Sequence, residues 1–338
     1  MKVYQGIGIA RALASLAPLR RPVRYSLRGK VAVITGGSRG LGLALAREFA
    51  RHGTKLALLA RDRDELDRAA ANLRDWGAEV KTWPCDVRED QEVLKAISGI
   101  EQAYGGIDLL VNNAGVMLVA PLKAMTREDF EEAMEVHFWG PYRMTMAALP
   151  LLMRNTESRI VNISSIGGRV AVPHMAPYCA SKFALTGFSD AIRTELAAQG
   201  VRVTTVSPGL MRTGSHINAE FKGDHSKEFA WFSLSAAMPF LSIDATRAAR
   251  QIVDAARRGR RELTITLQAR SLTVAQAMFP NLLARVLQLA NSLLPRASGD
   301  TGSARRNGHE SQSAVSPSPL TFLADQASPR FNERPAQD

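Results

Sequence analysis

Short apolar runs alternate with longer stretches of helical periodicity between Lys30 and Leu267. Such runs are typical of buried strands, whereas apolar residues that recur at helical spacing are typical of helices that cover a sheet. The alternation predicts an α/β fold, in which about seven strands form a doubly wound parallel sheet with helices on both faces. We expect the strands at Val31–Ile34, Leu56–Leu59, Val80–Trp83, Leu109–Val111, Ile160–Ile163, Val201–Val206 and Leu263–Ile265.

This pattern defines one domain at residues 29–268, with an extension at each end. The N-terminal extension, residues 1–28, is a basic arm without a single acidic residue, in a chain whose formal net charge is +11. The body is therefore only mildly basic, which argues against a nucleic-acid-binding surface. Because Arg11 interrupts the apolar stretch of the arm, a secretory signal or a membrane span is disfavoured, and we expect a cytoplasmic protein.

The C-terminal extension has two parts of different composition. Residues 269–295 form an apolar helical segment, which we expect to pack on the body, while a dimer contact or a membrane surface stays open. Residues 296–338 are rich in Ser, Pro, Gly, Gln and charge without periodicity, which predicts a disordered tail. Peripheral membrane contact through the arm or the apolar segment is an open alternative. One helical face of that segment holds Leu282, Leu283, Val286, Leu287, Ala290, Leu293 and Leu294.

A serine, a tyrosine and a lysine near the fifth predicted strand have a spacing that suits proton transfer. Ser165 follows the strand, and Tyr178 and Lys182 are separated by one helical turn on a helix that begins near Pro177. This spacing places both side chains on one helix face. A neighbouring ammonium is expected to lower the pKa of the phenol, which favours general acid catalysis, and Ser165 could hydrogen-bond the substrate oxygen.

These three residues and a glycine loop resemble the short-chain dehydrogenase/reductase family. The loop, Thr35–Gly42, has the family's TGxxxGxG form between a strand and a helix, where glycines and helix N–H groups accommodate a pyrophosphate. The NNAG sequence after the fourth strand and the YxxxK sequence Tyr178–Lys182 also match the family. The resemblance implies a Rossmann-like fold, hydride transfer between a nicotinamide cofactor and a carbonyl or alcohol, and a homo-oligomer.

The resemblance also assigns cofactor contacts by position. An Asp after the third strand contacts the adenine, NNAG lines the cofactor cleft, a Pro-Gly pair with a downstream Thr holds the nicotinamide amide, and the lysine binds the nicotinamide ribose. With the loop and one arginine considered next, the expected cofactor residues are Gly36, Ser38, Arg39, Gly40, Leu41, Gly42, Arg61, Asp86, Val87, Asn113, Ala114, Gly115, Tyr178, Lys182, Pro208, Gly209 and Thr213.

The residues after the second strand favour NADP over NAD. An acid there would hydrogen-bond the adenine ribose and repel a 2′-phosphate, whereas this chain has Ala60 and Arg61. Together with Arg39 in the glycine loop, two guanidinium groups are available to pair with a phosphate. Asp62 is expected to cap the next helix.

One position departs from the family pattern. The helix after NNAG usually carries an asparagine three residues before a glycine, where it helps to hold a water in the proton-relay path, but here His137 precedes Gly140. Either His137 joins the relay, because an imidazole titrates near neutrality, or backbone groups hold the water and the position tolerates the change.

The two cysteines carry no evident chemistry. Neither Cys85 nor Cys179 has a His or Cys at zinc-type spacing, so we predict no metal site, and two cysteines do not imply a disulfide framework.

Residues 214–242, where the family carries its substrate lid, are aromatic and apolar, which favours a hydrophobic ketone or secondary alcohol as the substrate. The alternative is that these side chains pack on the body or on a second subunit. The lid residues are Phe221, Phe229, Trp231, Phe232, Met238 and Phe240, and the residues expected to approach the same cleft are Met117, Val119, Trp139, His174 and Met175.

Two other functions stay open. A 3-oxoacyl-thioester reductase would need a basic patch near the cleft for an acidic carrier protein, and Arg127, Arg169 and Arg212 are the candidates for such a patch. A catalytically silent, cofactor-bound scaffold would recruit a partner or membrane through the extensions. The intact serine, tyrosine and lysine argue against the scaffold.

Overall fold

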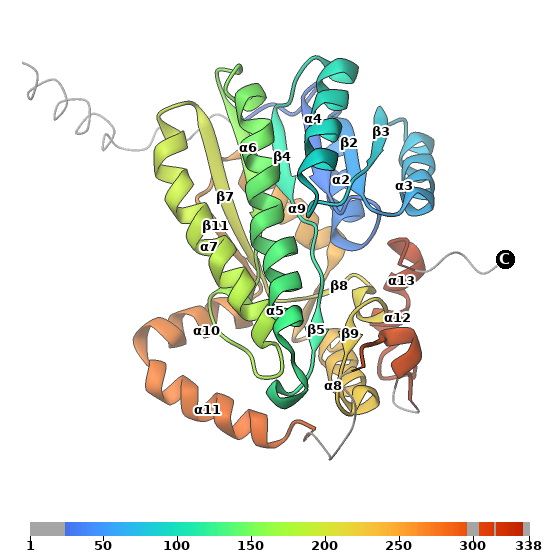
Figure 1. The fold of residues 1–338 in the computed structure, drawn as a ribbon, viewed down its shortest axis with the longest axis vertical. Coiled ribbons are helices and arrows are strands. Elements are labelled where there is room, and N and C mark those ends of the chain that lie inside the picture. The colour runs from blue at the N-terminus through green and yellow to red at the C-terminus, as the bar shows by residue number, and fades with distance from the viewer. Residues whose placement is uncertain (1–23, 296–303, 314–315, 334–338) are drawn as a thin grey trace, which may run out of the picture.

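Seven parallel strands form the central sheet of the computed structural model, which describes residues 24–295, 304–313 and 316–333 (Figure 1). Their order is β11-β7-β6-β4-β1-β2-β3, so the chain winds outward in both directions from β1. The predicted fold class is confirmed, and each predicted strand overlaps an observed one. The strands are β1 (Val31–Thr35), β2 (Lys55–Ala60), β3 (Val80–Pro84), β4 (Leu109–Asn112), β6 (Ser158–Ile163), β7 (Val201–Pro208) and β11 (Glu262–Ile265).

Helices cover both faces of the sheet and bury its apolar side chains in two separate clusters. One face is covered by α2 (Gly40–Arg51), α3 (Arg63–Asp75) and α9 (Ala245–Arg257). The other is covered by α4 (Asp90–Tyr104), α6 (Gly140–Leu152) and α7 (Ala176–Ala197).

Local sequence signals set where several of these helices begin. Asp62 caps α3, because its carboxylate accepts from the N–H of Glu65 at 2.8 Å, as predicted. Asp244 does the same for α9, accepting from Arg247 at 3.1 Å. Pro177 lies in the first turn of α7, where a missing N–H costs nothing.

Short strands and helices lie beyond the carboxyl ends of the central strands (Figure 1). A three-stranded sheet joins β5, β9 and β12, and a two-stranded one joins β8 and β10. Between them, α5 continues directly into a π-helical turn, η2, and then into α6. These elements are β5 (Leu118–Val119), η1 (Leu122–Ala124), α5 (Arg127–Met134), η2 (Glu135–Trp139), η3 (Ile166–Gly168), β8 (Leu210–Arg212), η4 (Ser215–Ile217), β9 (Glu220–Phe221), α8 (His225–Ala237), β10 (Ser242–Asp244) and β12 (Arg306–Asn307).

The tail differs from its prediction as a disordered segment. Residues 304–313 and 316–333 form η5 (Gly308–Ser311), α12 (Phe322–Asp325) and α13 (Ala327–Arg330), and they pack against the domain (Figure 1). Isolated side chains, rather than a periodic face, hold them there. Arg305 bonds to the buried carboxylate of Asp129 at 2.7 Å and contacts two neighbouring glutamates, and Phe331 is 1% exposed.

The apolar segment also differs from its prediction, because little of it packs on the body. It forms two helices, α10 (Leu267–Met278) and α11 (Pro280–Ser292), whose only buried residues are Ala269 and Leu283. Most of the predicted apolar face of α11 is therefore exposed. The large apolar side chains exposed on the pair are Leu267, Leu272, Val274, Met278, Phe279, Leu282, Val286, Leu289 and Leu293.

Candidate active site

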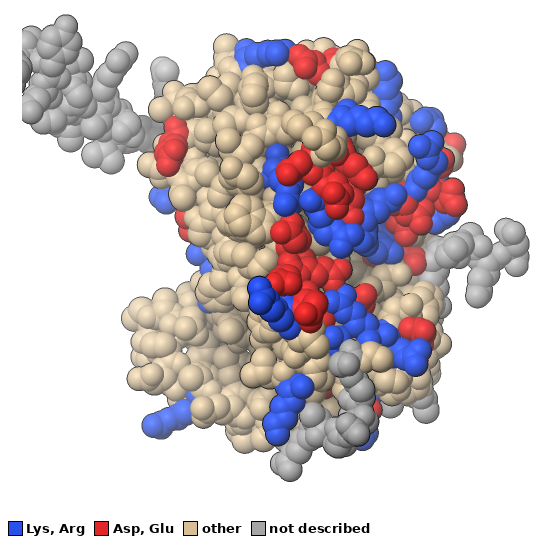
Figure 2. Space-filling view, viewed as in Figure 1, with Lys and Arg blue, Asp and Glu red and all other residues tan. Residues whose placement is uncertain are grey.

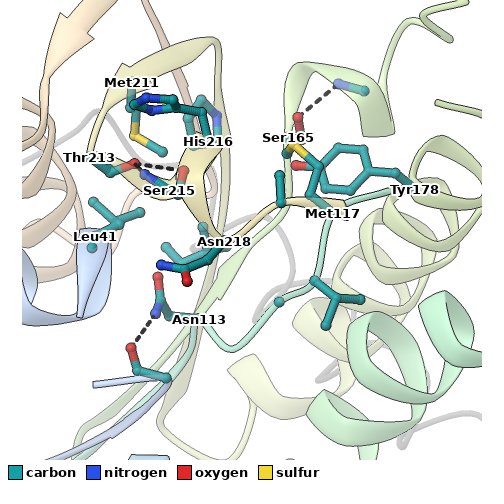
Figure 3. A pocket seen from close by; sticks show the side chains of 18 of the residues that line it. Leu41, Asn113, Met117, Ser165, Tyr178, Met211, Thr213, Ser215, His216 and Asn218 are labelled. Atoms are coloured by element: carbon teal, nitrogen blue, oxygen red, sulfur yellow. Dashed lines mark hydrogen bonds between the residues drawn. The ribbon is translucent and has the colours of Figure 1, made fainter. Parts of the chain in front are cut away.

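A single cavity of about 1110 Å³ lies at the carboxyl ends of the strands and brings the predicted catalytic side chains together. Ser165 enters it from the end of β6, and Tyr178 and Lys182 enter it from the first turns of α7. Figure 3 shows Ser165 and Tyr178 on one side of the pocket and Asn113, Thr213 and the neighbouring side chains on the other.

The serine hydroxyl lies beside the tyrosine and influences the pKa of its phenol. Burial raises the pKa of Tyr178 to about 12, while the hydrogen bond from Ser165 counteracts this rise. The hydroxyl of Ser165 also accepts from the N–H of Gly167 at 3.0 Å, which fixes its position (Figure 3). At neutral pH the phenol therefore holds its proton.

The sequence predicted that Lys182 lowers the pKa of the phenol. In the structure, burial is instead the largest influence on the pKa of both groups. The Nζ of Lys182 donates to the carbonyl oxygen of Ile163 at 2.9 Å and lies 5.7 Å from the centre of the Tyr178 ring. Burial lowers the pKa of Lys182 itself to about 7. The helical spacing correctly places the two side chains on one face, but it cannot show that burial disfavours the charged form of the lysine.

His137 is buried behind the tyrosine and uses both ring nitrogens within the protein. Its Nε2 accepts from the N–H of Val116 at 3.1 Å, so the ring proton lies on Nδ1, which is 2.8 Å from the hydroxyl of Ser181. That hydroxyl in turn donates to the carbonyl oxygen of Tyr178 at 2.9 Å. Burial, reinforced by the charge of Lys182, lowers the pKa of His137 well below its usual value, so the imidazole is neutral.

The glycine loop fits a phosphate because backbone lies where side chains would otherwise be. Gly36 has a φ of 60°, and a Cβ on Gly42 would lie 1.9 Å from the carbonyl oxygen of Gly36. Asn113 holds the loop, since its Nδ2 donates to the carbonyls of Thr35 (3.0 Å) and Gly36 (3.1 Å). The absence of side chains at Gly36, Gly40 and Gly42 thus leaves room for backbone to approach a phosphate at the start of α2.

At the expected adenosine end of the cavity, the two arginines differ in their contacts. Arg39 is paired with Glu65 at 3.3 Å, whereas Arg61 is exposed at the rim, and within the described part of the chain no carboxylate lies within ion-pair distance of it. Asp86 lines the cavity, but its carboxylate is bound by Arg88, at 2.6 Å for the shortest contact. Arg61 is thus the cation available to a phosphate.

The other expected cofactor residues also surround the cavity. Gly42 lies beneath the loop, and the remainder line the space: Ser38, Gly40, Leu41, Val87, Ala114, Gly115, Pro208, Gly209 and Thr213. Thr213 is buried and donates to the hydroxyl of Ser215 at 2.8 Å (Figure 3). A long groove with a glycine cradle at one end and a proton donor at the other suits a dinucleotide.

The substrate end is lined by part of the predicted aromatic lid. Trp231 and Phe232 on α8 line the cavity together with Met117 and Met175. Phe221 and Phe229 instead form a buried cluster beneath them, which is the packing alternative, and Met238 and Phe240 are exposed. The expectation that Val119, Trp139 and His174 approach the cavity is wrong, because none of them lines it.

A buried acid that the sequence analysis did not identify orients this lid. Glu228, fully buried on α8, accepts from the indole Nε1 of Trp231 at 2.6 Å and lies 2.8 Å from Nδ1 of His174. From sequence alone, an isolated glutamate in a helix is expected to be solvent-exposed. Only the folded structure shows that Glu228 lies between the rings of Trp231 and His174 and holds Trp231 in place.

The three arginines proposed for a carrier-protein patch are each engaged elsewhere. Arg127 pairs with Glu131 at 2.6 Å and Arg169 with Glu262 at 2.8 Å. Arg212 donates to the carbonyl oxygen of Ser242 at 2.9 Å. Two of the three charges are therefore compensated by a glutamate, whereas within the described residues that of Arg212 is not.

Fold and cavity together define a dinucleotide-binding oxidoreductase, and comparison with known proteins places it in a family. The family model for short chain dehydrogenases matches residues 30–222, so the chain belongs to that family. It is 36% identical over 217 residues to "Dehydrogenase/reductase SDR family protein 7-like" of Anopheles gambiae, covering 63% of this chain and 68% of that relative.

Two solved structures show the same relationship. A metagenomic short-chain oxidoreductase in complex with NADP is 36% identical, with a TM-score of 0.52 over 54% of this chain and 84% of that one. L-sorbose reductase from Gluconobacter frateurii, complexed with NADPH and L-sorbose, is 26% identical, with a TM-score of 0.65 over 72% of this chain and 97% of that one.

Proposed function

We propose that this protein is an NADPH-dependent reductase of a hydrophobic ketone, working through Ser165, Tyr178 and Lys182. The observation that carries the proposal is that a protonated phenol lines the same cavity as Ser165, Lys182 and a glycine cradle. Bound NADPH supplies the hydride.

The protein residues then have separate tasks. Ser165, fixed by the N–H of Gly167, orients the substrate carbonyl, and Tyr178 donates its proton to the carbonyl oxygen. Lys182 is held by the carbonyl of Ile163, and the family resemblance assigns it to the nicotinamide ribose. His137 acts as a positioning residue, because both of its nitrogens are used to hold backbone and Ser181 around the tyrosine.

The preference for NADPH is supported by Arg61, an exposed guanidinium at the rim where an NAD-specific site would carry an acid. Related structures solved with NADP or NADPH are consistent with this choice. A hydrophobic substrate is supported by Trp231, Phe232, Met117 and Met175 at the other end of the cavity. The ion pairs of Arg127 and Arg169 make the thioester reductase the weaker alternative.

Replacement of Tyr178 by Phe tests the proposal. We expect Tyr178→Phe to retain NADPH binding, followed by cofactor fluorescence, and to lose about 100-fold or more in the oxidation of NADPH with a panel of hydrophobic ketones. Tyr142→Phe is the matched control, because Tyr142 is 39% exposed and lies outside the cavity. Unchanged turnover in Tyr178→Phe would remove the phenol from the acid role. NADPH binding without turnover of any carbonyl by the wild type would favour the scaffold.

A homo-oligomer is proposed through an exposed aromatic surface on one side of the molecule. Trp139, Tyr142 and Met146 project from η2 and α6, and Phe183 projects from the adjacent α7. Exposed aromatic and other large apolar side chains of this kind are typical of protein interfaces. Light scattering should therefore give a mass above that of one chain, and Met146→Asp should shift it to the monomer.

Peripheral membrane contact is proposed through α10 and α11. Figure 2 shows these helices as a largely uncharged surface at the lower left of the molecule, and the only charged residues from 267 to 295 are Arg270 and Arg285. Apolar side chains with basic and no acidic neighbours suit an anionic bilayer surface. No helix in the described ranges is long and apolar enough to span a membrane. Cosedimentation with phosphatidylglycerol vesicles, lost in Phe279→Asp, is the test.

A further inference from the structure

A segment from the far end of the chain lies across the glycine loop. Asn332 donates through Nδ2 to the carbonyl oxygens of Ser38 (2.9 Å) and Glu65 (3.0 Å). The carbonyl oxygen of Phe331 accepts from the N–H of Gly40 at 2.9 Å. Because Gly40 is the first residue of α2, this N–H is one of the helix-terminal donors that bind phosphate in dinucleotide folds. The tail therefore uses a donor that a pyrophosphate would use.

Glu333 adds a negative charge at the same place. Its Oε2 lies 3.6 Å from Nε of Arg39 and accepts from Nδ2 of Asn218 at 2.5 Å. Its Oε1 is so near the loop that a Cβ added to Gly40 would lie 2.7 Å from it. The side chain is only 3% exposed, and burial raises its pKa to about 7. A carboxyl group of the protein, ionised above about pH 7, thus lines the phosphate end of the cavity.

The segment is held there by its own packing. Phe331 is buried in the cluster beneath α2, and the guanidinium of Arg47 lies 5.6 Å from the centre of its ring. Arg47 also donates to the carbonyl oxygen of Arg330 at 2.9 Å, and Arg330 donates to Thr246 at 2.9 Å. Residues 327–333, which we call the strap, therefore have a position that is defined by their contacts with the domain.

We propose that the strap is an intramolecular competitor of the dinucleotide, and that Glu333 lowers cofactor affinity by occupying Arg39 and the start of α2. Two anions at one partly buried site repel each other, so the phosphates and the Glu333 carboxylate cannot both be bound there without cost. Binding of the cofactor then requires the strap to move away. The identity of that cofactor rests on the proposed function, whereas the anion site rests on the contacts of Arg39 and Gly40.

The full-length protein is compared with Glu333→Gln and Glu333→Ala. The Kd for NADPH, measured by its fluorescence, is expected to fall about tenfold in both variants, because one like charge beside the phosphates is removed. Inorganic pyrophosphate, measured by calorimetry, should show the same change. Glu310→Gln is the matched control, since it removes one tail carboxylate that caps η5 away from the cavity, and it should leave both Kd values within twofold.

Hydrogen exchange of residues 327–333 is the second measurement. NADPH should speed exchange in the strap of the wild type, although a ligand usually slows exchange near its site. An unchanged or higher Kd in both Glu333 variants, or slower exchange in the strap, would overturn the proposal and make the strap a clamp over the cofactor. If pyrophosphate follows the prediction but neither nicotinamide dinucleotide binds, the proposed function fails and the competition stands. If no variant binds pyrophosphate or NADPH, both fail.

Discussion

Arg61 provides the sharpest test of the cofactor choice, because the structure separates its contribution from that of Arg39. Arg39 shares its charge with Glu65 and Glu333, at 3.3 and 3.6 Å, whereas Arg61 is exposed at the rim of the cavity. A hydrogen bond from a guanidinium to a charged group contributes about 1.5–3 kcal/mol. Loss of that bond corresponds to a rise of roughly 10- to 150-fold in Kd, and a carboxylate in its place adds repulsion.

We therefore expect Arg61→Asp to raise the Kd for NADPH by about 30-fold or more while the Kd for NADH changes by less than about threefold. Arg63→Asp is the matched control: it makes the same change of charge two residues later, at the first position of α3, where the side chain is exposed and outside the cavity. Fluorescence titration with both cofactors gives the ratio directly. An equal loss of NADPH affinity in the two variants would show a general charge effect, and an unchanged ratio in Arg61→Asp would refute the phosphate assignment.

Three further predictions follow from particular contacts. Asp129→Ala, which leaves a buried lysine without its partner, should lower the free energy of unfolding in urea by about 3–5 kcal/mol, whereas exposed Glu131→Ala should change it by less than about 0.5 kcal/mol. Gly42→Ala should abolish NADPH binding, because its Cβ would lie 1.9 Å from a backbone oxygen, while Gly187→Ala, with nothing within 4 Å, should raise the free energy of unfolding by about 0.5–1 kcal/mol. Because burial lowers the pKa of Lys182 to about 7 and raises that of Tyr178 to about 12, the kcat of ketone reduction should show no transition between about pH 8 and 10; a fall in kcat within that range would contradict a protonated phenol.

The sheet was predictable because parallel strands that are buried on both faces must be continuous apolar runs, and such runs are visible in a sequence. The β1 run is an example, since Val31–Ile34 is both apolar and buried at every residue. The spacing of Tyr178 and Lys182 was equally readable, because helical geometry alone brings them to one face. The pKa values of these two groups could not be predicted from the sequence, since they depend on how deeply each group is buried in the folded protein. No local sequence pattern indicates that burial.

The composition of residues 296–338 led to a wrong prediction of disorder for the described part of the tail, and the reason is physical. A polar segment without periodicity has no apolar face, and the absence of such a face usually means that ordering the chain is not compensated. Here a few isolated side chains supply the compensation: Arg305 reaches a buried carboxylate, Phe331 enters the main core, and Glu333 pairs with Arg39. Each of these residues alone resembles an ordinary surface residue of a disordered chain.

The same contacts explain why the glycine loop and the tail have to be considered together. A glycine loop exposes N–H groups so that an anion can approach, and it is indifferent to whether that anion belongs to a ligand or to the chain itself. A tail that places a buried carboxyl group beside Gly40 therefore opposes the cofactor at the site that binds its phosphates. Substitution of Glu333 should consequently change cofactor affinity in the direction opposite to substitution of Arg61, although both side chains lie at the phosphate end of one cavity. If both substitutions weaken NADPH binding, the two residues act together in holding the cofactor, and the competition is excluded.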